Sequence, residues 1–282
     1  MFTLNCKGRI LVIDKPIVMG IVNVTPDSFY NESRKFESTE ILNQAEKMLS
    51  EGATILDIGG QSTRPGSEDV GVDEELKRVI PAIEMLSKYF SDAIISVDTY
   101  RSTVVEEAVA AGASMVNDIS GGSLDKRMLE TVGKLNVPYI LMHIKGTPQT
   151  MQQYAEYKNV SLEVLDYFIK KVEECRLAGI NDVIIDPGFG FAKTIQHNFE
   201  LLNQLEVFKI LDRPFLVGIS RKSTIYKTLG VTAQEALNGT TVLNTAALLK
   251  GANILRVHDV KEAMEVVKLV DAIQQPTYES QK

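Results

Sequence analysis

Eight apolar runs in this chain each end at a side chain that can do chemistry. An apolar run that stops at a polar residue indicates a buried strand whose end reaches a ligand or solvent. Carboxylates, amides and cations brought together offer hydrogen bonds to a planar heterocycle and charge to an anion. The residues at these ends are Asn23, Asp57, Asp98, Asn117 with Asp118, His143, Asp186, Arg221 with Lys222, and Arg256 with His258.

One of these ends has the composition of a heterocycle site. Asp186 is followed by Pro187-Gly188-Phe189-Gly190 and then by Phe191. A carboxylate at a strand end can accept two parallel hydrogen bonds from the amidine edge of a ring, and glycines let the backbone pass close to such a ring. We expect Phe191 to cover the flat face of that ring. The alternative for Asp186 alone is a carboxylate that caps its own turn.

Cations gather at the last two ends of the series. Arg221 and Lys222 follow the seventh run, and Arg256 and His258 follow the eighth. Phosphate sites in barrels frequently lie after strands 7 and 8, where a helix N-terminus also favours an anion. On a chain of net charge −7, such a local cluster favours a small anion over a polyanion. The alternative is that Arg221 or Arg256 pairs with carboxylates on neighbouring loops, with the Arg221 side chain pointing out of the barrel.

Other polar residues at the run ends carry weaker signals. The Thr63-Arg64-Pro65 segment offers a hydroxyl, a guanidinium and a rigid turn. Asn23 offers an amide oxygen to Mg²⁺, which binds a few oxygen ligands besides waters and phosphate. His143 has no Cys or second His beside it, so we expect a hydrogen-bonded supporting role rather than a zinc ligand.

The elements that must position these residues alternate strand and helix along the chain. Without a Gly-x-Gly-x-x-Gly fingerprint after the first strand, eight such units favour a closed (β/α)8 TIM barrel over a doubly wound sheet. We expect a single domain over 1–282, with an N-terminal β-hairpin (2–6 and 9–13) that plugs the barrel bottom. The expected strands are 17–23, 53–58, 93–98, 114–119, 138–142, 182–186, 214–219 and 252–257. The expected helices are 38–51, 72–90, 101–111, 124–135, 158–178, 195–211, 222–229, 233–250 and 260–274, and 25–33 is expected to be a loop.

Composition narrows the class of protein. The 44% hydrophobic and 24% charged content is that of a globular protein with a large core. No apolar run approaches the ~20 residues of a membrane span, no Lys/Arg run suggests nucleic-acid binding, and the N-terminus does not resemble a secretory signal. Cys6 and Cys175 are expected to be free thiols, which favours the cytoplasm.

Beyond these single residues, the chain carries a series of longer motifs: Met19–Phe29, Asp57–Gly66, Ser96–Thr99, Asn117–Gly122, Leu141–His143, Asp186–Phe191, Gly218–Ser223 and Arg256–His258. In composition and order these motifs resemble the dihydropteroate synthase family over nearly the whole chain. Two departures from the family pattern stand out: Tyr30-Asn31-Glu32-Ser33 replaces a Ser-Asp-Gly-Gly-like turn, and Ala192 stands where many members carry glycine.

The resemblance implies a transferase of folate biosynthesis that uses Mg²⁺ and two small-molecule substrates. It would join 7,8-dihydropterin-6-ylmethyl diphosphate to 4-aminobenzoate, by an SN1-like path, and work as a homodimer. By the same resemblance, the pterin would be held by Asp98, Asn117, Asp186 and Lys222, with Met142 on its ring, and the metal by Asn23. The diphosphate would be held by Thr63, Arg64, Arg256 and His258, and the 4-aminobenzoate, with which sulfonamides compete, by Pro65, Phe191 and Ser223. The catalytic residues would be Asp98, Lys222 and Arg256.

Three other functions remain open from the sequence. A pterin-dependent methyltransferase has a similar pterin pocket, but needs a cobalamin-protein partner. A Schiff-base aldolase would use Lys222 as its nucleophile, with Arg221 lowering the lysine pKa. A non-catalytic pterin-binding protein would have no use for the residues that face a diphosphate.

Overall fold

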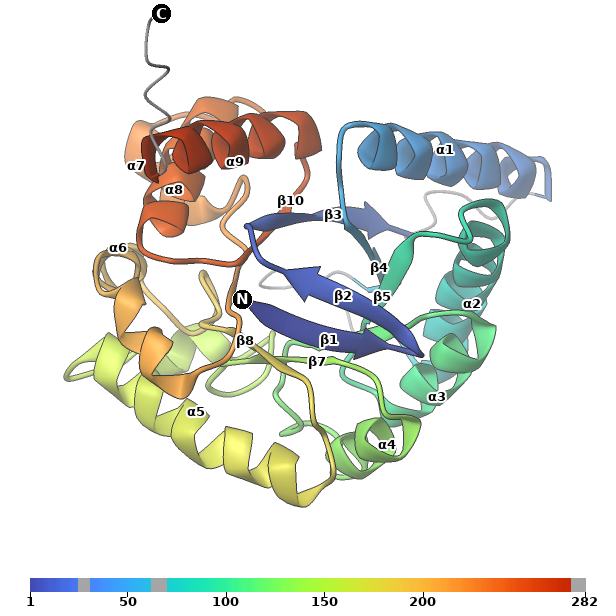
Figure 1. The fold of residues 1–282 in the computed structure, drawn as a ribbon, viewed down its shortest axis with the longest axis horizontal. Helices are drawn as coiled ribbons and strands as arrows, with labels where there is room; N and C mark the ends of the chain where they lie inside the picture. The colour runs from blue at the N-terminus through green and yellow to red at the C-terminus, as the bar shows by residue number, and fades with distance from the viewer. Residues whose placement is uncertain (25–30, 62–69, 275–282) are drawn as a thin grey trace, which may run out of the picture.

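Eight parallel strands form a closed barrel surrounded by helices (Figure 1). The computed structural model describes residues 1–24, 31–61 and 70–274. The strands pair in the order β8-β7-β6-β5-β4-β3-β10-β9, and a bridge between Ile185 and Phe215 joins β8 to β9. The predicted TIM barrel is therefore confirmed. Its strands are β3 (Ile17–Asn23), β4 (Ile55–Gly59), β5 (Ile94–Asp98), β6 (Met115–Asp118), β7 (Tyr139–Met142), β8 (Val183–Asp186), β9 (Leu216–Val217) and β10 (Ile254–Val257).

The helices follow the predicted order, with four differences in their bounds. Helix α1 begins at Asn31 rather than near residue 38, because the intervening stretch contains no glycine or proline to stop a helix. The loop predicted over 25–33 is thus wrong for 31–33, and 25–30 lie outside the described residues. The helices are α1 (Asn31–Ser50), α2 (Val72–Tyr89), α3 (Ser102–Ala111), α4 (Met128–Leu135), α5 (Val160–Leu177), α6 (Ile195–Asn203), α7 (Ser223–Leu229), α8 (Leu237–Leu249) and α9 (Val260–Gln274), with 3₁₀ turns η1 (Met151–Tyr154) and η2 (Leu205–Leu211).

The other three differences have local causes. Helix α8 begins four residues after its predicted start, because Thr232 donates its backbone N–H to Glu235 Oε2 and holds the preceding segment as a turn. Helix α4 starts four residues after its predicted beginning because Asp125 accepts hydrogen bonds from the backbone N–H groups of Ser102 and Arg127. These bonds hold the segment before Met128 as a turn. The helix predicted over 195–211 is divided at Gln204 into α6 and the tighter η2.

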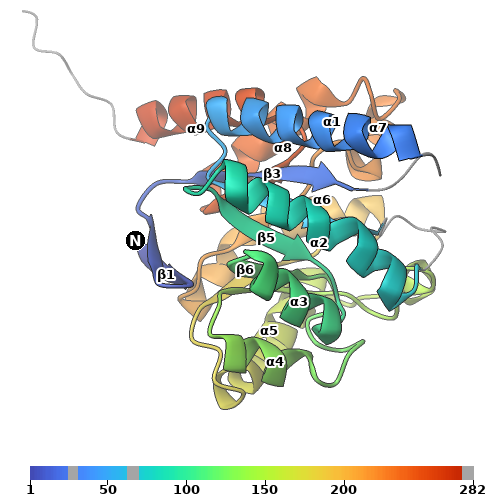
Figure 2. The same ribbon diagram turned by 90° about the vertical axis from the view of Figure 1, so that its right-hand side faces the viewer.

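A two-stranded antiparallel hairpin covers one end of the barrel, as predicted (Figure 2). It consists of β1 (Phe2–Cys6) and β2 (Arg9–Ile13), joined by Lys7 and Gly8, both at positive φ. Positive φ at both loop residues matches the type of two-residue turn that hairpins prefer. The hairpin turns its apolar face toward the barrel through Leu4, Cys6, Leu11 and Ile13.

The barrel interior above this hairpin begins with one apolar side chain from each strand. We call these eight residues the floor layer. They pack with the hairpin in one cluster, so this end of the barrel is filled. The floor layer comprises Met19, Ile55, Ile94, Met115, Ile140, Ile184, Leu216 and Ile254.

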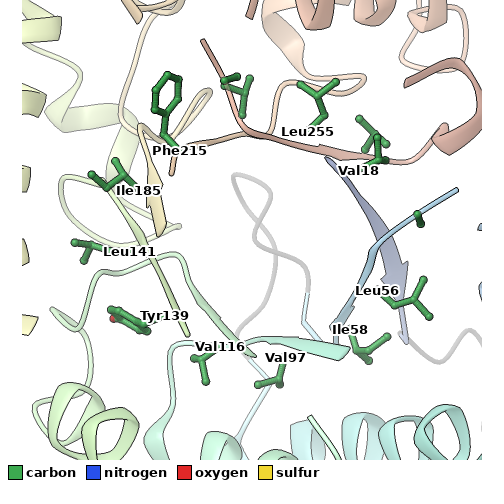
Figure 3. Close-up of a cluster of buried hydrophobic side chains, with 14 of the residues drawn as sticks. Val18, Leu56, Ile58, Val97, Val116, Tyr139, Leu141, Ile185, Phe215 and Leu255 are labelled. Carbon is green, nitrogen blue, oxygen red and sulfur yellow. The ribbon is translucent and has the colours of Figure 1, made fainter. Parts of the chain in front are cut away.

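The neighbouring strand positions point outward and pack against the helices. Figure 3 shows ten of these side chains around the barrel wall, among them Tyr139 and Phe215. Phe168 of α5 is completely buried in the same cluster, with its ring 5.8 Å from that of Phe208. Cys6 and Cys175 are free, as expected, and both are buried.

Candidate active site

A second layer of inward-facing residues lies above the floor layer. Side chains alternate between the two faces of a strand, so the residue two positions beyond each floor residue also points inward. We call this set the middle layer. It consists of Ile21, Asp57, Ser96, Asn117, Met142, Asp186, Gly218 and Arg256. The change from an apolar floor to a largely polar middle layer places the candidate site at the carboxyl ends of the strands.

An ion-pair network joins three residues of the middle layer to Asp98 at the end of β5. Arg256 Nε is 2.6 Å from Asp57 Oδ2, and Arg256 Nη2 is 2.6 Å from Asp98 Oδ2. Asn117 Nδ2 donates to the same Asp57 oxygen at 2.8 Å. Burial raises the pKa of Asp98 to about 7, although Arg256 acts to lower it. Three residues predicted from the sequence to share one site, Asp98, Asn117 and Arg256, therefore lie together in the structure.

Asp186 and Lys222 form the opposite side of the site. Asp186 Oδ1 accepts a hydrogen bond from the backbone N–H of Gly188 at 2.8 Å, and the carboxyl group is almost fully buried. Lys222 Nζ donates to the carbonyl of Phe189 and lies 4.5 Å from the centre of the Phe191 ring. Burial lowers the pKa of Lys222 to about 8, and nearby Asp186 opposes that change. The lysine and the carboxylate thus stabilise each other's charged form.

The loop after β8 brings its backbone close to these groups. Gly188 and Gly190 have φ of 72° and 82°. A Cβ on Gly188 would lie 2.1 Å from the carbonyl oxygen of His143, so only glycine fits there. Ala192 also has positive φ, at 49°, which explains why glycine is the commoner residue at a position of this conformation.

A buried lysine that the sequence analysis did not identify holds this loop in place. Lys193 Nζ lies 3.0 Å from His143 Nδ1 and donates to the carbonyls of Gly188 and Phe191, both at 3.1 Å. Lys193 is 3% exposed, and burial lowers its pKa to about 7. His143 thus has a buried, hydrogen-bonded supporting position. A single lysine after a glycine-rich motif carries no sequence signal for such burial.

A small apolar cluster lies beside the polar groups. It joins Met142 at the end of β7 to Phe191 of the β8 loop, with Tyr100 packed against it. Methionine and phenylalanine side chains next to hydrogen-bonding groups suit a flat heterocycle. The buried members are Ile119, Met142, Ile144, Met151, Phe191 and Ala192.

The last two strand ends supply the remaining predicted residues. Ser220 Oγ lies 3.0 Å from His258 Nδ1, which precedes the first turn of α9. Ser223 is the first residue of α7 and is partly exposed. Arg221 points away from the site and pairs with Asp259, with its Nε 2.8 Å from Asp259 Oδ2. The alternative that we considered for Arg221 is therefore correct.

Of the four remaining predicted residues, the structure describes only Asn23. Asn23 ends β3 with an exposed side chain. The predicted anion and 4-aminobenzoate contacts Thr63, Arg64 and Pro65 lie outside the described residues. Within residues 1–24, 31–61 and 70–274, no group of three or more His, Cys, Asp or Glu side chains is arranged to hold a metal ion. In the same described part, none of the helices is both long enough and apolar enough to cross a membrane.

The barrel and its site define the class of the protein. A family model described as "Pterin binding enzyme" matches residues 19–258, which extend from the first barrel strand to His258. That span contains every residue of the middle layer.

Similar proteins narrow the class further. The Escherichia coli K12 dihydropteroate synthase is 43% identical over 271 residues, covering 95% of each chain. The enzyme of Synechocystis is 44% identical over 259 residues, covering 91% of this chain and 89% of its own. A crystal structure of Yersinia pestis dihydropteroate synthase with a sulfonamide drug aligns with a TM-score of 0.90, at 41% identity, over 97% of this chain and 99% of its own. The chain therefore belongs to the dihydropteroate synthase family of enzymes.

Proposed function

We propose that this enzyme condenses 7,8-dihydropterin-6-ylmethyl diphosphate with 4-aminobenzoate, giving 7,8-dihydropteroate and diphosphate for folate biosynthesis. The observation that carries the proposal is the convergence of Asp98, Asn117, Asp186, Lys222 and Arg256 on one barrel mouth. Related structures from Xanthomonas albilineans support it, since one contains 4-aminobenzoic acid and another 7,8-dihydropteroate. They align with TM-scores of 0.89 and 0.84, at 39% and 36% identity, over 96% of this chain and 98% of each of theirs.

The pterin ring binds between the two charged sides of the site. Asp186 accepts from the ring's N–H edge, and Lys222 donates to a ring acceptor. Asn117 and Asp98 complete the hydrogen bonds from the other side. Met142 packs against one face of the ring, as its place in the apolar cluster supports.

The diphosphate lies toward the ends of β3 and β10. Arg256 and His258 donate to it, with Thr63 and Arg64 contributing from the loop after β4. Asn23 fits a magnesium site because its amide oxygen is exposed at a strand end, and Mg²⁺ commonly takes one or two protein oxygens besides water and phosphate. When bound, Mg²⁺ neutralises charge on the phosphate oxygens.

We propose that the reaction is SN1-like. Cleavage of the C–O bond leaves negative charge on the diphosphate, which Arg256 stabilises, and a conjugated cation on the pterin methylene, which the Asp98 carboxylate stabilises. The aromatic amine of 4-aminobenzoate is neutral at pH 7 and attacks without a strong general base. Pro65, Phe191 and Ser223 line its site, where a sulfonamide competes.

The test of catalysis is formation of dihydropteroate from the two substrates with Mg²⁺. We expect product only when both substrates are present. Borohydride with a carbonyl substrate, which would trap a Schiff base on Lys222, should give no covalent adduct. A methyltransferase would instead require a cobalamin protein. A protein that binds pterin but forms no product would refute the proposed reaction.

The test of the pterin contacts is calorimetric titration with the pterin diphosphate. Asp186→Ala and Lys222→Ala should each abolish measurable binding, whereas Arg256→Ala should chiefly weaken the diphosphate-dependent step. Unchanged affinity in either of the first two variants would remove that residue from the site. Removing Mg²⁺ with a chelator should stop turnover, and addition of Mg²⁺ should restore it.

We further propose that the enzyme acts as a cytoplasmic homodimer whose partners are these small molecules. Sedimentation equilibrium of the purified protein tests the dimer, which predicts twice the 31.2 kDa chain mass.

A further inference from the structure

Asp57 is a fully buried carboxylate at the centre of the middle layer. Its Oδ2 atom accepts two hydrogen bonds, from Asn117 Nδ2 at 2.8 Å and from Arg256 Nε at 2.6 Å. Both donors belong to residues that face the proposed ligand, whereas Asp57 itself has no exposed surface. Its effect on a ligand must therefore pass through these two neighbours.

The hydrogen bond to Asn117 decides which end of the amide faces the ligand. An amide group has a donor end and an acceptor end, while a carboxylate paired with a guanidinium only accepts. Asn117 must therefore turn its NH₂ group toward Asp57. Among the described residues nothing donates to Asn117 Oδ1, which leaves this oxygen as an acceptor for a ligand N–H.

The bond to Arg256 fixes the plane of the guanidinium. Nε donates to Asp57 on β4, and Nη2 donates to Asp98 on β5. These two strands are neighbours in the barrel. Within the described part of the chain, Nη1 has no acceptor, so its two N–H groups are left for an anionic ligand. A single anchor at Asp98 would let the guanidinium rotate about that contact.

We propose that Asp57 is a positioning residue that presents Asn117 as an acceptor and Arg256 as a donor to the pterin diphosphate. It touches neither the substrate nor the reacting atoms. This inference rests on the proposed function and deepens it, because it explains how one buried group sets the hydrogen-bonding pattern that the ligand meets.

Two variants separate the geometry of Asp57 from its charge. Asp57 Oδ1 and the hydroxyl of Ser96 are buried without partners among the described residues, and the two residues are paired on adjacent strands. In Asp57→Asn the amide oxygen takes the Oδ2 position and the NH₂ group faces Ser96. The variant thus keeps the acceptor and loses the charge, whereas Asp57→Ala loses both.

Calorimetric titration with the pterin diphosphate tests the positioning role. We expect Asp57→Ala to weaken binding by about tenfold or more, about 1.4 kcal/mol, and Asp57→Asn to weaken it by less. In an Asn117→Ala background the loss caused by Asp57→Ala should shrink, because the amide that Asp57 orients is already gone. Equal losses in both backgrounds would overturn the inference.

The pH profile of kcat/KM tests the electrostatic coupling. The carboxylate of Asp98 contacts Arg256 on β10, and the charges of Asp57 on β4, Glu75 on α2 and Asp118 on β6 also act on it. Arg256 lowers the Asp98 pKa and the three acids raise it. Asp57→Asn removes one of these acids, so the acid limb of the profile should move to lower pH by about half a unit or more. A limb that stays in place would also overturn the inference.

The outcomes distinguish this inference from the proposed function. If the wild-type protein neither binds the pterin diphosphate nor forms dihydropteroate, both fail. If the wild type does both, but Asp57→Ala binds normally or the Asp57→Asn profile is unmoved, only the role of Asp57 fails. Should Asp57→Ala not fold, the Asp57→Asn profile alone decides the question.

Discussion

Replacing Lys193 with methionine should change how the stability of this protein depends on pH. The folded pKa of Lys193 is about 7, against 10.5 for a free lysine, because burial disfavours the ammonium. Between these two values the unfolded chain binds more protons than the folded one. The free energy of unfolding therefore rises with pH across this range.

The size of the effect follows from the two pKa values. From pH 7 to pH 9, Lys193 alone should add about 2 kcal/mol to the free energy of unfolding. Lys222, with a pKa of about 8, adds a smaller amount over the same range. Burial raises the pKa of the thiols Cys6 and Cys175 to about 12 from a usual 9.0, so they act in the opposite direction, beginning only near pH 9 at the top of this range.

The assay is urea unfolding of the wild type and Lys193→Met at pH 7, 8 and 9. The variant should lose the contribution of Lys193 and keep the smaller slope caused by Lys222. Lys47→Met, which removes an exposed lysine of α1, is the matched control and should keep the wild-type slope. A Lys193→Met slope equal to that of the wild type would refute a proton-linked role for the buried lysine.

Three further predictions concern the frame around the site. Gly188→Ala should destabilise the protein by about 3 kcal/mol or more, because it combines positive φ with a backbone clash. The control Gly218→Ala should have little effect, because the added Cβ would meet only ordinary contacts near 3.9 Å. Thermal unfolding of both variants measures the difference. Phe168→Ala should cost about 3–5 kcal/mol in urea unfolding because it empties a fully buried site, and a loss below about 1 kcal/mol would contradict the packing. Arg221→Ala should lower stability by about 1–3 kcal/mol through loss of the Asp259 pair without changing pterin affinity, and a large affinity loss would contradict its outward orientation.

The barrel could be predicted because each of its strands has a simple sequence pattern. Each strand is a short apolar run, and its inward-facing polar residue, such as Asn117 or Asp186, falls at the end of that run. Parallel strands bring these ends to one face of the barrel, so the residues of the proposed pterin side could be grouped from the sequence. The same pattern predicted the hairpin, since Lys7-Gly8 separates two alternating segments.

Other features depend on contacts that no local pattern records. The burial of Lys193 arises only because His143 and two carbonyls from the β8 loop meet around it. The double role of Asp57 requires strands β6 and β10 to approach the same oxygen, over 60 and 199 residues of separation. The early start of α1 and the division of 195–211 were also missed. The residue at which a helix begins or ends depends on hydrogen bonds at its termini, which the sequence pattern does not record.

Each barrel strand has a fixed alternation of side chains that point into the barrel and side chains that point toward the helices. Leu56 and Ile58 flank Asp57 and belong to the outer wall (Figure 3). Removal of one residue within β4 would turn Asp57 toward the helices and one of these apolar side chains into the mouth. Insertions and deletions are therefore tolerated only beyond the strand ends. An alignment of functional relatives should show its gaps in the loops and none within the barrel strands.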